Sequence, residues 1–231
     1  METTASALGA VPVQAGGASA WLLAAGAMPW PQLQSRAWKL LDAAERERAA
    51  RLRLQADRHA YVMAHALRRL VLGQALQTDP AALVFAQDAH GRPHLAGAAG
   101  APFFSLSHTR EAVAFALANQ PIGIDIESEK IVNFDFALLK SFVERPPTAS
   151  GEPPGDFATC WTSMEAFWKA KGTGLVDGQP LLQLVREGSD LLSARLRDAA
   201  GRWIEQARIH LLRKIPGCVG AMAVLHECGS S

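Results

Sequence analysis

The clearest helical pattern runs from Trp161 to Gly172, where apolar side chains return every three or four residues. At about 100° per residue these side chains share one arc, which predicts an amphipathic helix that ends at the glycine. Glu165 and Lys169 lie four positions apart and leave the helix side by side on the border of that arc. The structural alternative is an ordinary surface pair that stabilises a helix. The apolar residues are Trp161, Met164, Phe167 and Trp168.

A strict alternation marks the segment from Ile122 to Glu127 as a strand. Its isoleucines point to one side, and Gly123, Asp125 and Glu127 point to the other. Two carboxylates on one face make half of a hard-cation site, which Glu165 would complete, and Mg²⁺ prefers such oxygen ligands beside a phosphate. The alternative is an edge strand with solvent-facing acids.

Earlier segments predict one strand and two helices. Residues 1–17 have the composition of a frayed terminus, and residues 18–24 form a first strand. Residues 33–54 predict a helix rich in arginine, and residues 58–76 predict a long helix capped by Asp57. The core-facing positions expected in the second helix are Val62, Ala66, Leu67, Leu70 and Val71.

The remaining elements are short. A strand at 103–106 delivers Ser107 and His108 at its end, and a strand at 111–118 pairs with 122–127 as a hairpin. Ser107 beside His108 also suggests a serine hydrolase, but the chain lacks the Gly-x-Ser-x-Gly turn of many such enzymes.

Further along, residues 136–142 predict a short helix and residues 144–155 a loop rich in proline. Strands are expected at 179–186, 203–212 and 218–226.

Composition narrows the function classes without choosing among them. The 231 residues carry a formal net charge of +1, so we expect no general attraction to nucleic acid or to an anionic membrane. The beginning of the chain has neither the basic cluster nor the unbroken apolar run of a signal peptide or membrane span. The three cysteines have no metal-ligand spacing, which fits a reducing cytoplasm.

Four motifs together resemble those of the 4'-phosphopantetheinyl transferases, in particular the larger monomeric, surfactin-synthetase-activating type. In chain order they are Gly91-Arg92-Pro93, Ser105-Leu106-Ser107-His108, Gly123-Ile124-Asp125-Ile126-Glu127, and Trp161 through Glu165-Ala166 and Lys169 to Gly172 and Gly174-Leu175. Each motif alone is weak, and their order over residues 91–175 makes the resemblance specific.

The resemblance implies an α+β fold of two similar halves, related by a pseudo-twofold axis and built from antiparallel strands and long helices, with the site between them. The corresponding division is 1–118 and 119–231. The implied function is Mg²⁺-dependent transfer of 4'-phosphopantetheine from coenzyme A to a serine of an acyl- or peptidyl-carrier protein. The partner is therefore a carrier protein domain, and the expected enzyme is a cytoplasmic monomer.

Roles for individual residues also follow from the resemblance. Asp125, Glu127 and Glu165 would bind Mg²⁺, Glu165 would take the serine proton, and Lys169 would stabilise phosphate charge. The coenzyme would lie against Arg92, Ser107 and His108, and basic residues of the first half would hold its 3'-phosphate. The candidates for that last role are Arg51, Arg53 and Arg58.

Met164 is the chief departure, because the family usually has lysine before the signature glutamate. One interpretation is that Met164 packs in the core while Lys169 or Lys171 supplies the charge. The other is a weakened enzyme, or a relative that binds carrier or coenzyme with little turnover. A metal-dependent phosphohydrolase is a third hypothesis. Ala60 also replaces an arginine common in the family, and Arg58 is a possible substitute.

Overall fold

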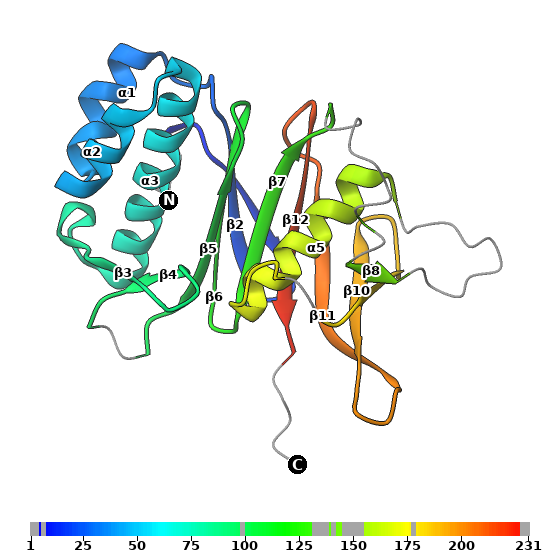
Figure 1. Cartoon of the computed structure of the whole chain (residues 1–231). Helices are drawn as coiled ribbons and strands as arrows, with labels where there is room; N and C mark the ends of the chain where they lie inside the picture. The colour runs from blue at the N-terminus through cyan, green and yellow to red at the C-terminus, as the bar shows by residue number, and fades with distance from the viewer. Residues whose placement is uncertain are drawn as a thin grey trace.

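Two sheets at the centre of the molecule organise the fold, which is of the α+β class (Figure 1). The structure is a computed structural model that describes residues 5, 8–97, 100–130, 139, 142–144, 155–176 and 179–226. The first sheet has the strand order β1-β2-β6-β5 and the second has the order β7-β12-β11-β10-β9-β8. All pairs in both sheets are antiparallel, apart from the parallel pair of β8 with β9.

The first sheet contains only strands from the first half of the sequence. Its strands are β1 (Val11–Ala15), β2 (Ala18–Ala24), β5 (Phe103–His108) and β6 (Ala112–Ala118). A separate hairpin is formed by β3 (Phe85–Gln87) and β4 (Pro93–Leu95), with Gly91 in the turn between them. The expectation of a frayed terminus is therefore wrong for Val11–Ala15, which pairs with β2 along its whole length.

The second sheet contains the remaining strands. They are β7 (Ile122–Ser128), β8 (Val143–Glu144), β9 (Leu182–Arg186), β10 (Leu191–Arg197), β11 (Trp203–Leu212) and β12 (Cys218–Leu225). The sequence analysis missed β10 because its residues alternate weakly between polar and apolar types. The predicted hairpin between 111–118 and 122–127 is also wrong, because β7 pairs with β12 while β6 pairs with β2 and β5.

The predicted helix at 33–54 is divided into α1 (Trp30–Arg36), the 3-10 turn η2 (Trp38–Leu40) and α2 (Ala43–Arg51). The division follows from a new helix start at Asp42, whose side chain accepts from the Glu45 amide while Glu45 accepts from the Asp42 amide. A continuous basic helix was therefore a wrong expectation.

The long helix α3 (Gln55–Leu76) confirms the second predicted helix and buries all five expected core positions. Its N-terminus lies at Leu54, so Asp57 is not the cap and instead binds Arg110. A 3-10 turn, η3 (Pro80–Ala82), follows α3.

A buried ion-pair network joins α2 to α3. Glu45 contacts Arg68 and Arg69, and its Oε1 atom lies at hydrogen-bond distance, 2.9 Å, from His65 Nδ1. Burial opposes the charge of Glu45, but hydrogen bonds from His65, the Asp42 amide and Arg69, together with the charge of Arg68, outweigh it and lower the pKa of Glu45 to about 2. The network fixes α2 on α3, beside the residues of the candidate site.

Three apolar clusters produce a layered arrangement. The helices of the first half cover one face of the first sheet, and α5 (Phe157–Lys171) covers one face of the second sheet. Between the sheets, alanines of β2 and β6 meet the isoleucines of β7 and residues of β12. The first sheet thus carries several helices on its outer face, and the second sheet carries α5. The expected pseudo-twofold relation and the division at 118/119 stay predictions.

Two sequence-based expectations lie mostly outside the described residues, namely the helix at 136–142 and the loop at 144–155. Among the described helices, none combines the length and apolar character needed to cross a membrane.

Candidate active site

Strand β7 and helix α5 lie in direct contact, and Gly123 makes that contact possible. A Cβ atom at Gly123 would lie 2.0 Å from the Ala166 carbonyl oxygen and 2.5 Å from the Ala170 amide nitrogen. No side chain fits at such distances, so the helix backbone rests on the strand. This close approach brings the two predicted carboxylate-bearing segments together.

Lys169, Asp125 and Ser107 form one hydrogen-bonded cluster from three elements. Lys169 Nζ lies 2.5 Å from Asp125 Oδ1, and Ser107 Oγ donates to the same oxygen at 2.8 Å. Lys169 Nζ also lies 3.4 Å from Ser107 Oγ. Residues 107, 125 and 169, from three predicted motifs, therefore meet, and Ser107 bonds to Asp125 rather than forming a hydrolase-like pair with His108.

The other two acids feel the same electrostatic environment. Burial and the negative charges of Asp125 and Glu165 raise the pKa of Glu127 to about 7, although Lys169 partly offsets this. Burial also raises the pKa of Glu165, where the Lys169 charge lowers it and the Asp125 charge raises it. The three carboxylates of β7 and α5 thus share one partly buried region with the ammonium group of Lys169 on α5.

The donor set fits a hard divalent cation. The second carboxylate oxygen of Asp125 is buried and has no hydrogen-bond partner within the described part of the chain. A cation would satisfy this oxygen and relieve the repulsion that raises the carboxyl pKa values. In the described arrangement no three acidic, histidine or cysteine side chains are close enough to form a ready-made metal cluster, and Lys169 occupies the facing oxygen of Asp125.

Met164 lies on the buried, apolar side of α5, about 100° around the helix from Glu165. Its side chain is fully buried in the same cluster as Phe167 and Trp168, as the apolar arc predicted. Lys169 reaches Asp125, whereas Lys171 is exposed. The positive charge beside Asp125 therefore comes from Lys169, and Met164 packs as a core residue.

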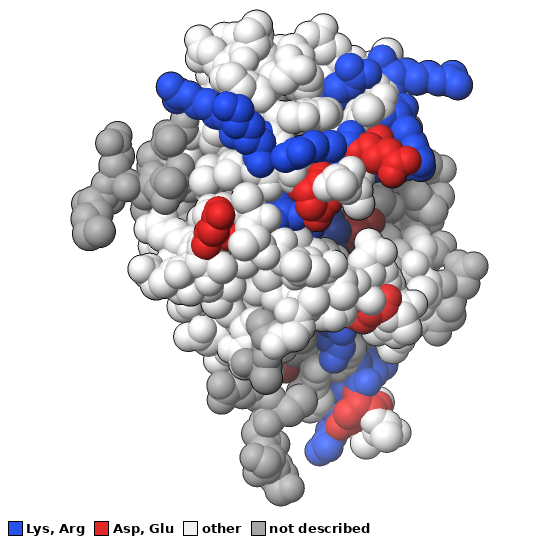
Figure 2. All heavy atoms as spheres, turned by 90° about the vertical axis from the view of Figure 1, so that its left-hand side faces the viewer, with Lys and Arg blue, Asp and Glu red and all other residues white. Residues whose placement is uncertain are grey.

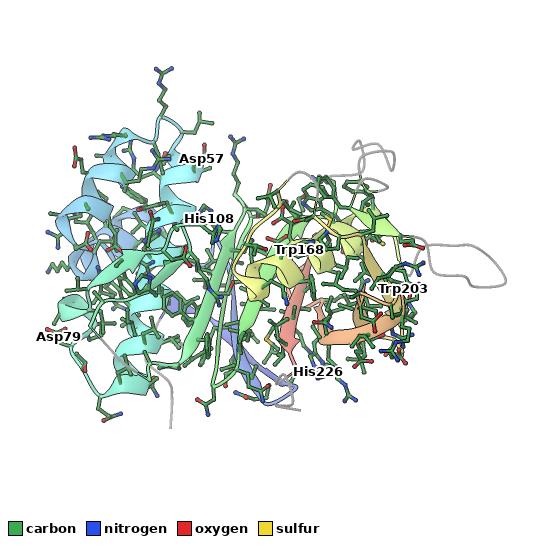
Figure 3. The ribbon with its side chains drawn as sticks, turned by 60° about the horizontal axis from the view of Figure 1, so that its bottom comes forward. Asp57, Asp79, His108, Trp168, Trp203 and His226 are labelled. Carbon is green, nitrogen blue, oxygen red and sulfur yellow. The ribbon has the colours of Figure 1, made fainter. Side chains whose placement is uncertain are left out.

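A pocket with a volume of about 470 Å³ lies beside His108. It is lined in part by Tyr61 of α3 and by two arginines that the sequence analysis did not select, Arg48 and Arg110. Figure 3 shows His108 between α3 and the strands, and Trp168 on α5 on the far side of those strands. Arg110 is held by Asp57, with Nε 2.5 Å from Oδ1. Arg48 was hidden in the sequence among many arginines of α2.

The three arginines chosen from the sequence do not line this pocket. Arg51 pairs with Glu47 on the exposed face of α2, and Arg58 donates to the Leu52 carbonyl. Arg53 is exposed just beyond the helix. Figure 2 shows lysine and arginine side chains spread across the upper part of this helical face.

Arg92 lies where the first half meets α5 and β7. Its guanidinium donates to the carbonyls of Ala170 and Ile122, both at 3.3 Å. It also lines a cavity of about 200 Å³ together with Lys169 and Gly172. Arg92 is therefore half-buried between β7 and α5 rather than free in solvent.

Comparison with known proteins shows which family the chain is similar to. The family described as "4'-phosphopantetheinyl transferase, N-terminal" matches residues 28–120. The 4'-phosphopantetheinyl transferase Sfp of Bacillus subtilis (strain 168) is 29% identical over 137 residues, covering 57% of this chain and 60% of that protein.

Two further relatives have similar names. A 4'-phosphopantetheinyl transferase of Bacillus subtilis is 29% identical over 169 residues, covering 71% of this chain and 70% of that protein. The 4'-phosphopantetheinyl transferase gsp of Aneurinibacillus migulanus is 27% identical over 128 residues, covering 52% of this chain and 51% of that protein. Over these stretches the chain is similar to 4'-phosphopantetheinyl transferases, including Sfp, of whose length it covers 60%.

Proposed function

We propose that this protein transfers the 4'-phosphopantetheine group from coenzyme A to a serine of an acyl- or peptidyl-carrier protein, as a monomer in the cytoplasm. The observation that carries the proposal is the cluster in which Asp125 binds both Lys169 and Ser107 beside two further acids. Such a cluster suits a pyrophosphate bound between a divalent cation and an ammonium group. The matches to named transferases support the same reaction class.

Asp125, Glu127 and Glu165 would hold Mg²⁺. When bound, Mg²⁺ neutralises charge on the pyrophosphate and on the departing phosphate oxygen. The fit rests on the partnerless oxygen of Asp125 and on the raised carboxyl pKa values, which indicate an excess of negative charge without a cation.

The remaining chemistry belongs to side chains of the chain. The serine oxygen of the carrier forms a bond to the phosphorus that carries pantetheine, and the bond to adenosine 3',5'-bisphosphate breaks. Glu165 would accept the serine proton, because it is the α5 carboxylate that shares the environment of Lys169 and Asp125. Lys169 contacts Asp125 Oδ1 at 2.5 Å, and its ammonium group would turn from this oxygen to the phosphate oxygens.

Coenzyme binding would extend from this cluster toward the pocket at His108. We propose that His108, Arg48 and Arg110 bind the 3'-phosphate of the coenzyme, because guanidinium groups match phosphate oxygens. Arg92 and Ser107 would lie along the coenzyme on the side of Lys169. The roles of Arg51, Arg53 and Arg58 stay predictions.

Intact-protein mass spectrometry tests the proposal. Apo carrier protein, coenzyme A and Mg²⁺ should yield a carrier heavier by one phosphopantetheine group, and Asp125→Asn should abolish the gain. Asp79→Asn is the matched control, because Asp79 caps a turn of the first half and binds the Ala81 amide. Binding of carrier or coenzyme without any mass gain would indicate a non-catalytic relative. Coenzyme cleavage without carrier would indicate a phosphohydrolase.

A further inference from the structure

The two sheets meet edge to edge at β5 and β7, where no backbone ladder joins them. Strand β7 pairs with β12 on one side, so the backbone groups of Ile122, Ile124 and Ile126 on its other edge have no strand partner. Unpaired groups on a buried edge cost free energy unless other donors and acceptors reach them. All three isoleucines are buried here.

Side chains of the first half contact one backbone group of each isoleucine on this edge. The Ile124 amide donates to Ser105 Oγ at 3.0 Å, and the Ile126 amide donates to Ser107 Oγ at 3.4 Å. Arg92 donates to the Ile122 carbonyl at 3.3 Å. Arg92, just before β4, and two serines of β5 thus each supply one contact where β7 lacks a strand partner.

We infer that Ser105 and Arg92 are positioning residues that hold β7 and α5 in register with the first half of the protein. Ser105 is buried and contacts no acid of the site, so its hydroxyl acts on the backbone of β7. Arg92 binds β7 and α5 at once, because its second amino group donates to the Ala170 carbonyl. These two side chains therefore fix the elements that bear Asp125 and Lys169.

The contacts between β5 and β7 also determine where Asp125 lies relative to Ser107. Ser107 accepts from the β7 backbone and donates to Asp125, so the serine can bond the carboxylate only while the edge keeps its register. A shift of one residue would turn Asp125 to the other face of the strand. The hydroxyl of Ser105, two residues earlier on the same face of β5, is the second point that prevents this shift.

Backbone hydrogen exchange of the ligand-free protein tests the inference directly. In Ser105→Ala the Ile124 amide should exchange about fivefold faster, because its partner is lost, while the Asp125 amide on the β12 side stays as in the wild type. Ser163→Ala is the matched control, since the Ser163 hydroxyl is buried without a partner among the described residues. Unchanged exchange at Ile124 in folded Ser105→Ala overturns the inference.

Arg92 provides an independent test that does not require Ser105→Ala to fold. Arg92→Gln should lower the urea midpoint of the ligand-free protein and reduce kcat, and Arg92→Lys should restore neither, because one ammonium group cannot bridge two carbonyls in this geometry. If Arg92→Gln left ligand-free stability unchanged and only raised the KM for coenzyme A, with lysine restoring it, Arg92 would act on the coenzyme alone and the positioning role would be refuted. The kcat measurement rests on the proposed function, whereas exchange and urea midpoints do not, so the two failures are distinguishable.

Discussion

Gly123→Ala is the substitution that most directly disturbs the contact between β7 and α5. The added methyl carbon would lie 2.0 Å from the Ala166 carbonyl oxygen and 2.5 Å from the Ala170 amide nitrogen. Carbon and oxygen atoms need roughly 3.2 Å or more, so the helix must move by more than about 1 Å or the strand must distort. Both obstacles are backbone atoms, so a change of side-chain rotamer cannot relieve the clash.

The magnitude follows from this displacement. Overpacking in a core costs about 1–3 kcal/mol and more where backbone must shift, so we expect the free energy of unfolding to fall by about 3 kcal/mol. Because the same movement separates Lys169 and Glu165 from Asp125, turnover should fall about 100-fold, the cost of a 1 Å misplacement of reacting groups. Urea denaturation and the rate of carrier modification, measured by intact mass, report the two effects.

Two glycines calibrate the result. A Cβ at Gly220 would lie 3.2 Å from the Asp125 carbonyl oxygen, so Gly220→Ala should have a small effect on both measurements. Gly26 has open space around it, and Gly26→Ala should change neither. If Gly123→Ala matched Gly26→Ala in stability and rate, the close packing of α5 on β7 would not position the site, and the reasoning would be refuted.

Three further predictions concern other parts of the fold. Met164→Lys places an ammonium in a fully buried position and should destabilise the protein by at least about 3 kcal/mol. Met164→Leu should cost less than about 1.5 kcal/mol. Higher turnover in folded Met164→Lys would contradict the assignment of Met164 as a core residue. Because the pKa of Glu45 is about 2 in the fold and 4.5 ordinarily, its carboxylate should stabilise the protein above about pH 4.5 and lose that contribution as the pH falls toward 2. Glu45→Gln should therefore lower the urea midpoint at neutral pH and flatten its acid dependence, and a midpoint equal to wild type at pH 7 would count against the network. Arg48→Gln should raise KM for coenzyme A about tenfold with little change in kcat, while the same change at exposed Arg36 should leave steady-state kinetics unaltered.

The sequence predicted which faces of β7 and α5 the candidate residues occupy better than it predicted the pairing of the strands around them. Period-2 alternation placed Asp125 and Glu127 on one face of β7, and period-3.6 spacing separated Met164 from Glu165 on α5. These assignments succeeded because local periodicity alone determines which face a side chain occupies.

Pairing between distant strands could not be read in this way. The expected hairpin failed because β7 pairs with β12, almost one hundred residues away, and no local pattern encodes that choice. The arginines of the His108 pocket were missed for a similar reason. Arg48 differs from Arg51 only in the way α2 packs on α3, and that packing depends on the buried contacts of Glu45.

The central claim is that Asp125, Glu127 and Glu165 share one divalent cation. Calorimetric titration of Mg²⁺ into protein saturated with coenzyme A tests it most directly, with Asp125→Asn and Glu165→Gln beside the Asp79→Asn control. We predict saturable binding of one ion per chain that both site variants lose and the control retains. Absence of saturable binding in the wild type, or equal affinity in Asp125→Asn, would contradict the account.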